Sequence, residues 1–87
     1  MKLKDGLSKN RAGDDYIVIS DNREIFKGMI RLNESGAFLF DLLKNDISFD
    51  ELKNALMNKY AIDGELAKRD LSAFLKTFKD CGLIENE

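Results

Sequence analysis

The pattern of apolar residues changes near the middle of the chain, between Lys27 and Leu43. Before Asn33, apolar residues occupy every second position, which is typical of a strand with one buried face. After Gly36 they come in near-continuous pairs, as in a helix that is buried round most of its girth. The pattern therefore predicts a strand that runs directly into a buried helix.

The first third of the chain carries strand signals. A weak signal covers Gly6–Arg11, and a strong one covers Asp15–Ser20, which is rich in β-branched residues and lies between turn-prone segments. Apolar side chains of the strong segment alternate to both sides, so we expect it to be covered on both faces. A third strand is expected over Glu24–Leu32, and Gly28 within it indicates a bulge or a close backbone approach.

Two helices are predicted after this strand, and their first residues carry start signals. Asn33 is a good N-cap for the first helix. Ser48 and Glu51 form an S-x-x-E capping box for the second, with Ile47 and Leu52 in the two hydrophobic-staple positions. The start of the second helix is therefore predicted to within a residue or two.

A third helix is predicted to begin at Asp63 or Gly64 and to run to Cys81. Gly82 then occupies the position that favours a left-handed backbone, and Leu83 follows it as in a Schellman motif. The apolar face at helical spacing consists of Ala67, Leu71, Phe74, Leu75 and Phe78. The chain thus predicts three strands followed by three helices, an α+β fold in which the helices pack on the sheet.

Composition limits the size and the setting of this fold. The chain has 87 residues, enough for one domain over residues 1–87, with 44% hydrophobic and 34% charged residues. It has no His and a single Cys, Cys81, which excludes a zinc site and an internal disulfide. No apolar stretch is long enough for a signal peptide or a membrane helix, so we expect a cytoplasmic protein without membrane contact.

The residues that could serve catalysis all have simpler explanations. The acidic pairs belong to a turn or to the first turns of helices: Asp14–Asp15, Asp50–Glu51, and Asp63 with Glu65. Cys81 lies in the last turn of a helix, where the dipole disfavours a thiolate. No glycine-rich phosphate loop is present. We therefore predict that the chain is not an enzyme and holds no cofactor.

A winged-helix DNA-binding regulator is the alternative that the pattern leaves open, because the second and third helices resemble a helix-turn-helix. Over residues 64–81, four positive charges face three negative ones. The net charge of the whole chain is −2. Few phosphates would be neutralised, so binding to nucleic acid is disfavoured.

Three segments together resemble the PqqD-like family of small peptide-binding proteins, also called RiPP recognition elements. They are GMIRLNESGAFLFDLL, FDELKNALMNKYAID and RDLSAFLKTFKDCGLI, and the resemblance extends from about Leu7 to Ile84. It implies a winged-helix-like fold of a three-stranded antiparallel sheet and three helices. It also implies a non-catalytic chaperone that binds the leader of a ribosomally made precursor peptide. Such a protein presents the leader to a modifying enzyme, often a radical SAM protein, in natural-product or cofactor biosynthesis.

The resemblance also implies where the peptide binds: as a further strand on the edge of the third strand, beside the third helix. The residues expected to contact it are Gly28, Met29, Ile30, Arg31, Leu32, Leu66, Arg69, Asp70, Ala73, Phe74, Lys76 and Thr77. Which side chains of the third strand line the groove stays open, since either alternate set could do so. Arg69 and Lys76 would form a basic rim that selects an acidic leader.

Two further interpretations remain open at this point. The chain could be a structural subunit that stabilises a partner enzyme without binding peptide. The exposed strand edge could also pair with a second copy of the chain and give a homodimer. The sequence identifies neither the precursor peptide nor the partner enzyme.

Overall fold

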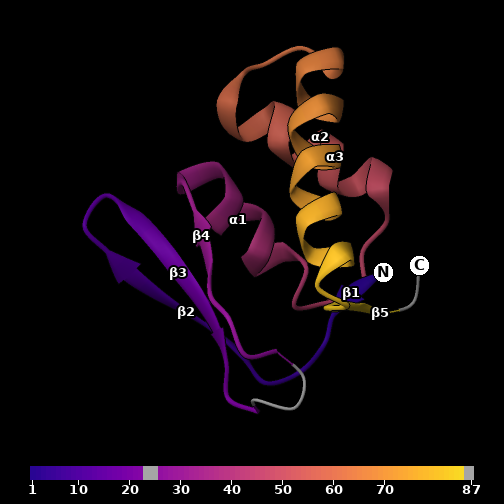
Figure 1. The fold of residues 1–87 in the computed structure, drawn as a ribbon. Coiled ribbons are helices and arrows are strands. Elements are labelled where there is room, and N and C mark those ends of the chain that lie inside the picture. The colour runs from indigo at the N-terminus through magenta and orange to yellow at the C-terminus, as the bar shows by residue number, and fades with distance from the viewer. Residues whose placement is uncertain (23–25, 86–87) are drawn as a thin grey trace.

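The computed structural model describes residues 1–22 and 26–85 of the chain. Figure 1 shows a small sheet on one side of the molecule and three helices on the other. In chain order the elements are β1 (Lys2–Leu3), β2 (Leu7–Ala12), β3 (Asp15–Ser20), β4 (Ile30–Leu32), α1 (Glu34–Leu42), α2 (Phe49–Tyr60), α3 (Gly64–Asp80) and β5 (Ile84–Glu85). The predicted α+β fold, with a three-stranded sheet followed by three helices, is confirmed.

The main sheet is antiparallel with the strand order β2-β3-β4, so that β3 is central and β4 is an edge. Its inner face packs on α1, and Val18 of β3 is fully buried there. On the outer face, Ile19 is 41% exposed. The expectation that β3 is covered on both faces is therefore wrong, because the helices all pack on one side of the sheet (Figure 1).

The strand before α1 is shorter than its sequence pattern predicts. It covers Ile30–Leu32, whereas the predicted strand begins at Glu24, which lies outside the described residues. Gly28 precedes the strand, and a Cβ atom placed on it would come within 3.2 Å of the Phe26 ring. Gly28 thus allows a close approach, but of a side chain and before the strand begins.

The predicted helix starts are confirmed by side-chain caps. The Asn33 side chain accepts a hydrogen bond from the backbone N–H of Gly36 at 2.9 Å, which caps α1. Ser48 and Glu51 form both bonds of the capping box at the start of α2. Asp63 caps α3 in the same manner as Asn33 caps α1.

The end of α3 has the predicted Schellman geometry. Gly82 has a φ of 71°, and its N–H donates to the carbonyl of Lys79 at 2.9 Å. The N–H of Leu83 donates to the carbonyl of Phe78, also at 2.9 Å. The chain therefore leaves α3 in a fixed direction, and Leu83 is fully buried.

A second, two-stranded sheet joins the beginning and the end of the chain, and the sequence did not predict it. β1 pairs with β5 in antiparallel fashion (Figure 1). Next to this pair, the N–H of Leu3 donates to the carbonyl of Leu43 at 2.8 Å. The N–H of Lys4 donates to the carbonyl of Leu83 at 2.9 Å. Leu3 is 3% exposed, so this pair of strands, which we call the β1–β5 clasp, is part of the core.

The core lies between the inner face of the sheet and the three helices. Phe40 of α1 and Phe78 of α3 are both fully buried, and their ring centroids lie 6.3 Å apart. This core fixes β4 and α3 beside each other.

Within residues 1–22 and 26–85, no helix combines the length and the apolar character that crossing a bilayer requires.

Candidate functional site

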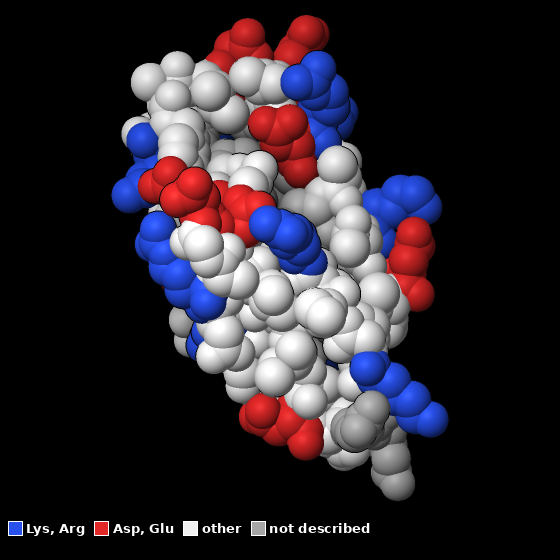
Figure 2. Space-filling view, turned by 60° about the vertical axis from the view of Figure 1, so that its left-hand side comes forward, with Lys and Arg blue, Asp and Glu red and all other residues white. Residues whose placement is uncertain are grey.

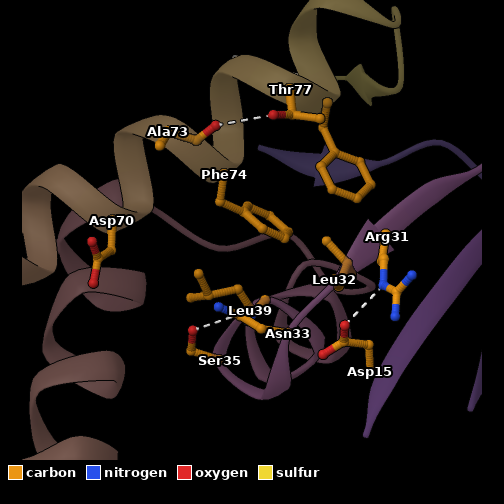
Figure 3. Close-up of a pocket in the computed structure, with 12 residues that line it drawn as sticks. Asp15, Arg31, Leu32, Asn33, Ser35, Leu39, Asp70, Ala73, Phe74 and Thr77 are labelled. Atoms are coloured by element: carbon orange, nitrogen blue, oxygen red, sulfur yellow. Dashed lines mark hydrogen bonds and ion pairs between the residues drawn. The ribbon is translucent and has the colours of Figure 1, made fainter. Parts of the chain in front are cut away.

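A hollow of about 520 Å³ lies between the edge strand β4 and the helix α3. Arg31 and Leu32 of β4 form one wall, and Ala73 and Thr77 of α3 form the other (Figure 3). Its remaining lining residues are Asp15, Asn33, Ser35, Gly36, Leu39, Asp70, Phe74 and Phe78. We call this hollow the β4–α3 groove.

The floor of the β4–α3 groove is apolar. Leu32, Leu39 and Phe74 are each less than a tenth exposed, and Figure 3 shows Phe74 projecting from α3 toward β4. The Phe74 ring stacks on that of Phe78 with 4.6 Å between centroids, which fixes its orientation. An apolar side chain that enters the groove would therefore meet a preformed hydrophobic surface.

The junction between β4 and α1 lies at one end of the groove. Gly36, in the first turn of α1, packs so closely that an added Cβ atom would lie 3.2 Å from the Cβ atom of Leu32. Ser35 donates a hydrogen bond to the Oδ1 atom of Asn33 at 3.0 Å, and this oxygen also caps the helix. The absence of a side chain at Gly36 thus lets α1 begin directly against the end of the strand.

Charged side chains border the groove at both ends. Arg31 Nε lies 2.8 Å from Asp15 Oδ2 across the outer face of the sheet, in an exposed ion pair. At the other end, Asp70 pairs with its neighbour Arg69, with 3.8 Å between the charged atoms. The polar border is therefore mixed in sign near Arg31 and acidic near Asp70.

Six of the twelve residues expected to contact a peptide line the groove: Arg31, Leu32, Asp70, Ala73, Phe74 and Thr77. The other six do not: Gly28, Met29, Ile30, Leu66, Arg69 and Lys76. The structure also settles which side chains of β4 face inward. Ile30 and Leu32 are 7% exposed and belong to the core, whereas the side chain of Arg31 points outward.

The basic rim expected from Arg69 and Lys76 is not formed at the groove. Lys76 lies on the other flank of α3, where it lines a smaller hollow with Phe49 and Ser72. Its Nζ atom is 3.0 Å from Asp80 Oδ2. Successive helical residues are about 100° apart, so Lys76 is turned away from the flank that carries Thr77. Arg69 and Lys76 therefore give no reason to expect that the leader peptide is acidic.

Six lining residues were absent from the sequence-based set: Asp15, Asn33, Ser35, Gly36, Leu39 and Phe78. Asn33 carried a signal in the sequence, but as a helix cap. Gly36 and Leu39 reach the groove because α1 packs against the end of β4, a contact that no local pattern encodes.

Tyr60, at the end of α2, has an unusual environment. Its hydroxyl oxygen is buried and forms no hydrogen bond within the described part of the chain. Its ring packs edge-on against Phe38, with 6.0 Å between centroids. Burial is the main cause that raises the pKa of Tyr60, and the nearby charges of Glu34 and Tyr16 add to it.

The charge on the face shown in Figure 2 is mixed. Lys and Arg side chains lie beside Asp and Glu at its margins and across its upper middle, and uncharged residues fill most of the area below. On α3, Lys76 is paired with Asp80 and Arg69 lies beside Asp70. The face shown in Figure 2 therefore carries no continuous basic stripe of the kind that binds duplex DNA, among the described residues drawn there.

Comparison with known proteins places the chain in a family. The family model described as coenzyme PQQ synthesis protein D (PqqD) matches residues 16–84. The chain belongs to the PqqD family. The matched region of this PqqD-family chain contains β3 from its second residue, β4 and all three helices, and therefore every lining residue of the groove except Asp15.

A solved structure has the same fold as this PqqD-family chain. It is described as TbiB1 in complex with the TbiA(beta) leader peptide, with a TM-score of 0.77 and 22% sequence identity. The similarity covers all of this chain and 98% of the other. A search of curated proteins gave no match. The predicted membership of the family is thus confirmed, and so is the fold.

Proposed function

We propose that the chain binds the leader segment of a ribosomally made precursor peptide, which adds as a strand to the edge of β4. The observation that carries this proposal is the β4–α3 groove, where an open strand edge borders a hollow of about 520 Å³ with an apolar floor. Membership of the PqqD family supports it, and so does the likeness to TbiB1, which is described in complex with a leader peptide.

Strand addition suits this geometry for two reasons. An edge strand has backbone N–H and C=O groups without sheet partners, and a peptide that pairs with them lies about 4.8 Å away. Side chains of such a peptide alternate between two faces. One set would enter the groove over Leu32 and Phe74, and the other would face solvent.

We further propose that the chain performs no chemistry itself and presents the leader to a modifying enzyme, a radical SAM protein. Backbone pairing would supply affinity, and the groove would select the peptide. The contacts proposed for the peptide are the exposed edge of β4 and the flank of α3 formed by Asp70, Ala73 and Thr77. The predicted contact residues that do not line the groove would affect peptide binding only indirectly, through neighbouring residues, or would not affect it.

The proposal is tested by filling the groove. Ala73 is exposed and lines it, so Ala73→Trp should block the peptide while the core stays intact. Ser72 is the matched control, because it is exposed on the same helix but lines the hollow on the opposite flank. With the leader of the short peptide encoded beside the protein, affinity should fall about tenfold or more for Ala73→Trp and stay unchanged for Ser72→Trp.

Amide spectra of the wild-type protein locate the site in the same titration. Shifts should concentrate on β4 and on the flank of α3 that carries Ala73 and Thr77. Equal affinity of the two tryptophan variants would contradict the proposal. Shifts confined to the outer side of α3, around Lys76, would contradict it as well.

A further inference from the structure

A second hollow of about 340 Å³ continues the β4–α3 groove past the start of α1. The two hollows share Asn33, Ser35 and Asp70 in their walls. The second hollow lies where β4 has ended and α1 has begun, next to the connection between α2 and α3. A chain that follows the edge of β4 toward its C-terminal end would therefore enter this space.

The inner surface of the second hollow is apolar, with one unsatisfied polar atom. Leu56 is 1% exposed, and Tyr60 and Ile62 are half-buried. The hydroxyl of Tyr60 has no hydrogen-bond partner within the described chain. This surface suits the aliphatic part of a long side chain that carries a polar or charged end.

The rim of the second hollow is acidic. Glu34 and Asp70 line it from the first turn of α1 and from α3. Glu34 forms no ion pair within the described residues. Among the described residues, the ion-pair partner of Asp70 is Arg69, whose side chain is 76% exposed and whose Nε lies 3.8 Å away. A cation between these carboxylates would be attracted by both.

We propose that the second hollow binds a lysine or arginine side chain of the same bound peptide. The methylene groups would lie on Tyr60 and Ile62, and the charged end would lie between Glu34 and Asp70. The inference rests on the proposed function and adds a sequence rule to it: a basic residue at a fixed spacing from the apolar residue that fills the β4–α3 groove. A peptide antiparallel to β4 would carry the basic residue on the N-terminal side of the apolar one, and a parallel peptide on the C-terminal side.

A selection experiment tests the rule without knowledge of the natural leader. Random 15-residue peptides are displayed and selected on the immobilised full chain. Wild-type protein should enrich peptides that combine an apolar residue with Lys or Arg at one spacing. On the double variant Glu34→Gln, Asp70→Asn, the basic preference should vanish while the apolar preference persists. Asp80→Asn is the matched control, since it removes one acid from α3 outside both hollows and should change neither preference.

A thermodynamic cycle then measures the contact itself. In the tightest selected peptide, the basic residue is replaced by Met. Affinity for the wild-type protein should fall about fivefold, as for a partly exposed ion pair, and affinity for the double variant should not change. Equal losses on both proteins would overturn the inference.

The outcomes separate this inference from the proposed function. Selection of peptides that share an apolar residue but no basic residue, with the enrichment lost on Ala73→Trp, would support the proposed function and overturn the inference of a basic contact. Selection of no peptide, or enrichment that Ala73→Trp does not affect, would remove the proposed function and the inference with it.

Discussion

The two edges of the main sheet are built differently. At the β2 edge, Lys9 lies opposite the buried Val18 and points to the inner face, where its Nζ atom is 2.8 Å from Asp41 Oδ2 of α1. At the β4 edge, the inward positions are apolar, and the only charged residue, Arg31, points outward. An inward-pointing charge discourages a further strand, and β4 lacks one.

The difference teaches what makes an edge suitable for binding. Both β2 and β4 have one side without a strand partner in the described sheet, but the hollows beside them differ. The hollow along β4 has an apolar floor, whereas the one at the start of β2 is bordered by Lys4, Asp5 and Lys44. A strand that added to β2 would place its side chains near Lys9 and Asp41, whereas one that added to β4 would bury them against Phe74 and Leu32. Side-chain burial therefore adds more to backbone pairing at the β4 edge than beside Lys9 and Asp41 at the β2 edge.

The largest expected effect concerns how firmly each edge is held to the core. Leu32→Ala on β4 should lower the free energy of unfolding by about 3 kcal/mol, because Leu32 is buried against α1. Leu7→Ala on β2 should lower it by about 1 kcal/mol, because Leu7 is only half-buried. Urea denaturation measures both losses. Equal losses would mean that the two edges are anchored alike.

A smaller effect is expected at the junction that follows β4. Asn33→Ala removes the cap of α1 and should lower stability by about 1 kcal/mol. Ser48→Ala removes a cap of α2 far from the edge and should lower it by a similar amount. Only the Asn33 variant should also weaken peptide binding, as measured by calorimetry. An unchanged stability would show that α1 begins elsewhere, for example at Ser35.

Removing the inward-pointing charge of Lys9 should let the edge of β2 pair with a strand of another molecule. Lys9→Thr eliminates the pair with Asp41 and introduces a good strand former, at a loss of about 0.5 kcal/mol in stability. We expect concentration-dependent self-association in sedimentation experiments. Lys4→Thr, at an exposed position between β1 and β2, is the control and should stay unassociated. A monomeric Lys9 variant would show that the charge does not protect this edge.

The smallest effect is expected for the ion pair beside β4. Arg31→Gln should change the free energy of unfolding by no more than about 0.5 kcal/mol, because the pair with Asp15 is exposed and screened by salt. Asp15→Asn should give the same change, and thermal denaturation at low and high salt compares them. A loss above about 1 kcal/mol would mean that the pair holds β4 in place.

Local signals predicted the helices well. Asn33, Ser48 with Glu51, and Asp63 each cap a helix as their sequence context indicates, since a cap involves residues only three positions apart. The clasp of β1 with β5 was missed because two-residue strands have no period to detect. Its partners are also separated by nearly the whole chain.

The residues of the groove were predicted in part, because only some of them are placed by a local pattern. Helical spacing places Leu66, Asp70, Ala73 and Thr77 on one flank of α3, and all of these except Leu66 line the groove. The inward direction of Leu32 could not be derived, because alternation gives two faces without saying which one is covered. The contribution of Gly36 depends on how α1 packs against β4, which is a tertiary contact.

The clasp between β1 and β5 has a consequence for how the domain can be attached to other molecules. Because Lys2 pairs with Glu85, any polypeptide joined before β1 or after β5 leaves the molecule at one place (Figure 1). A single tether at that place lets the whole domain swivel as a unit without pulling on β4. The length of the tether would then set the effective concentration of the domain around the molecule to which it is joined.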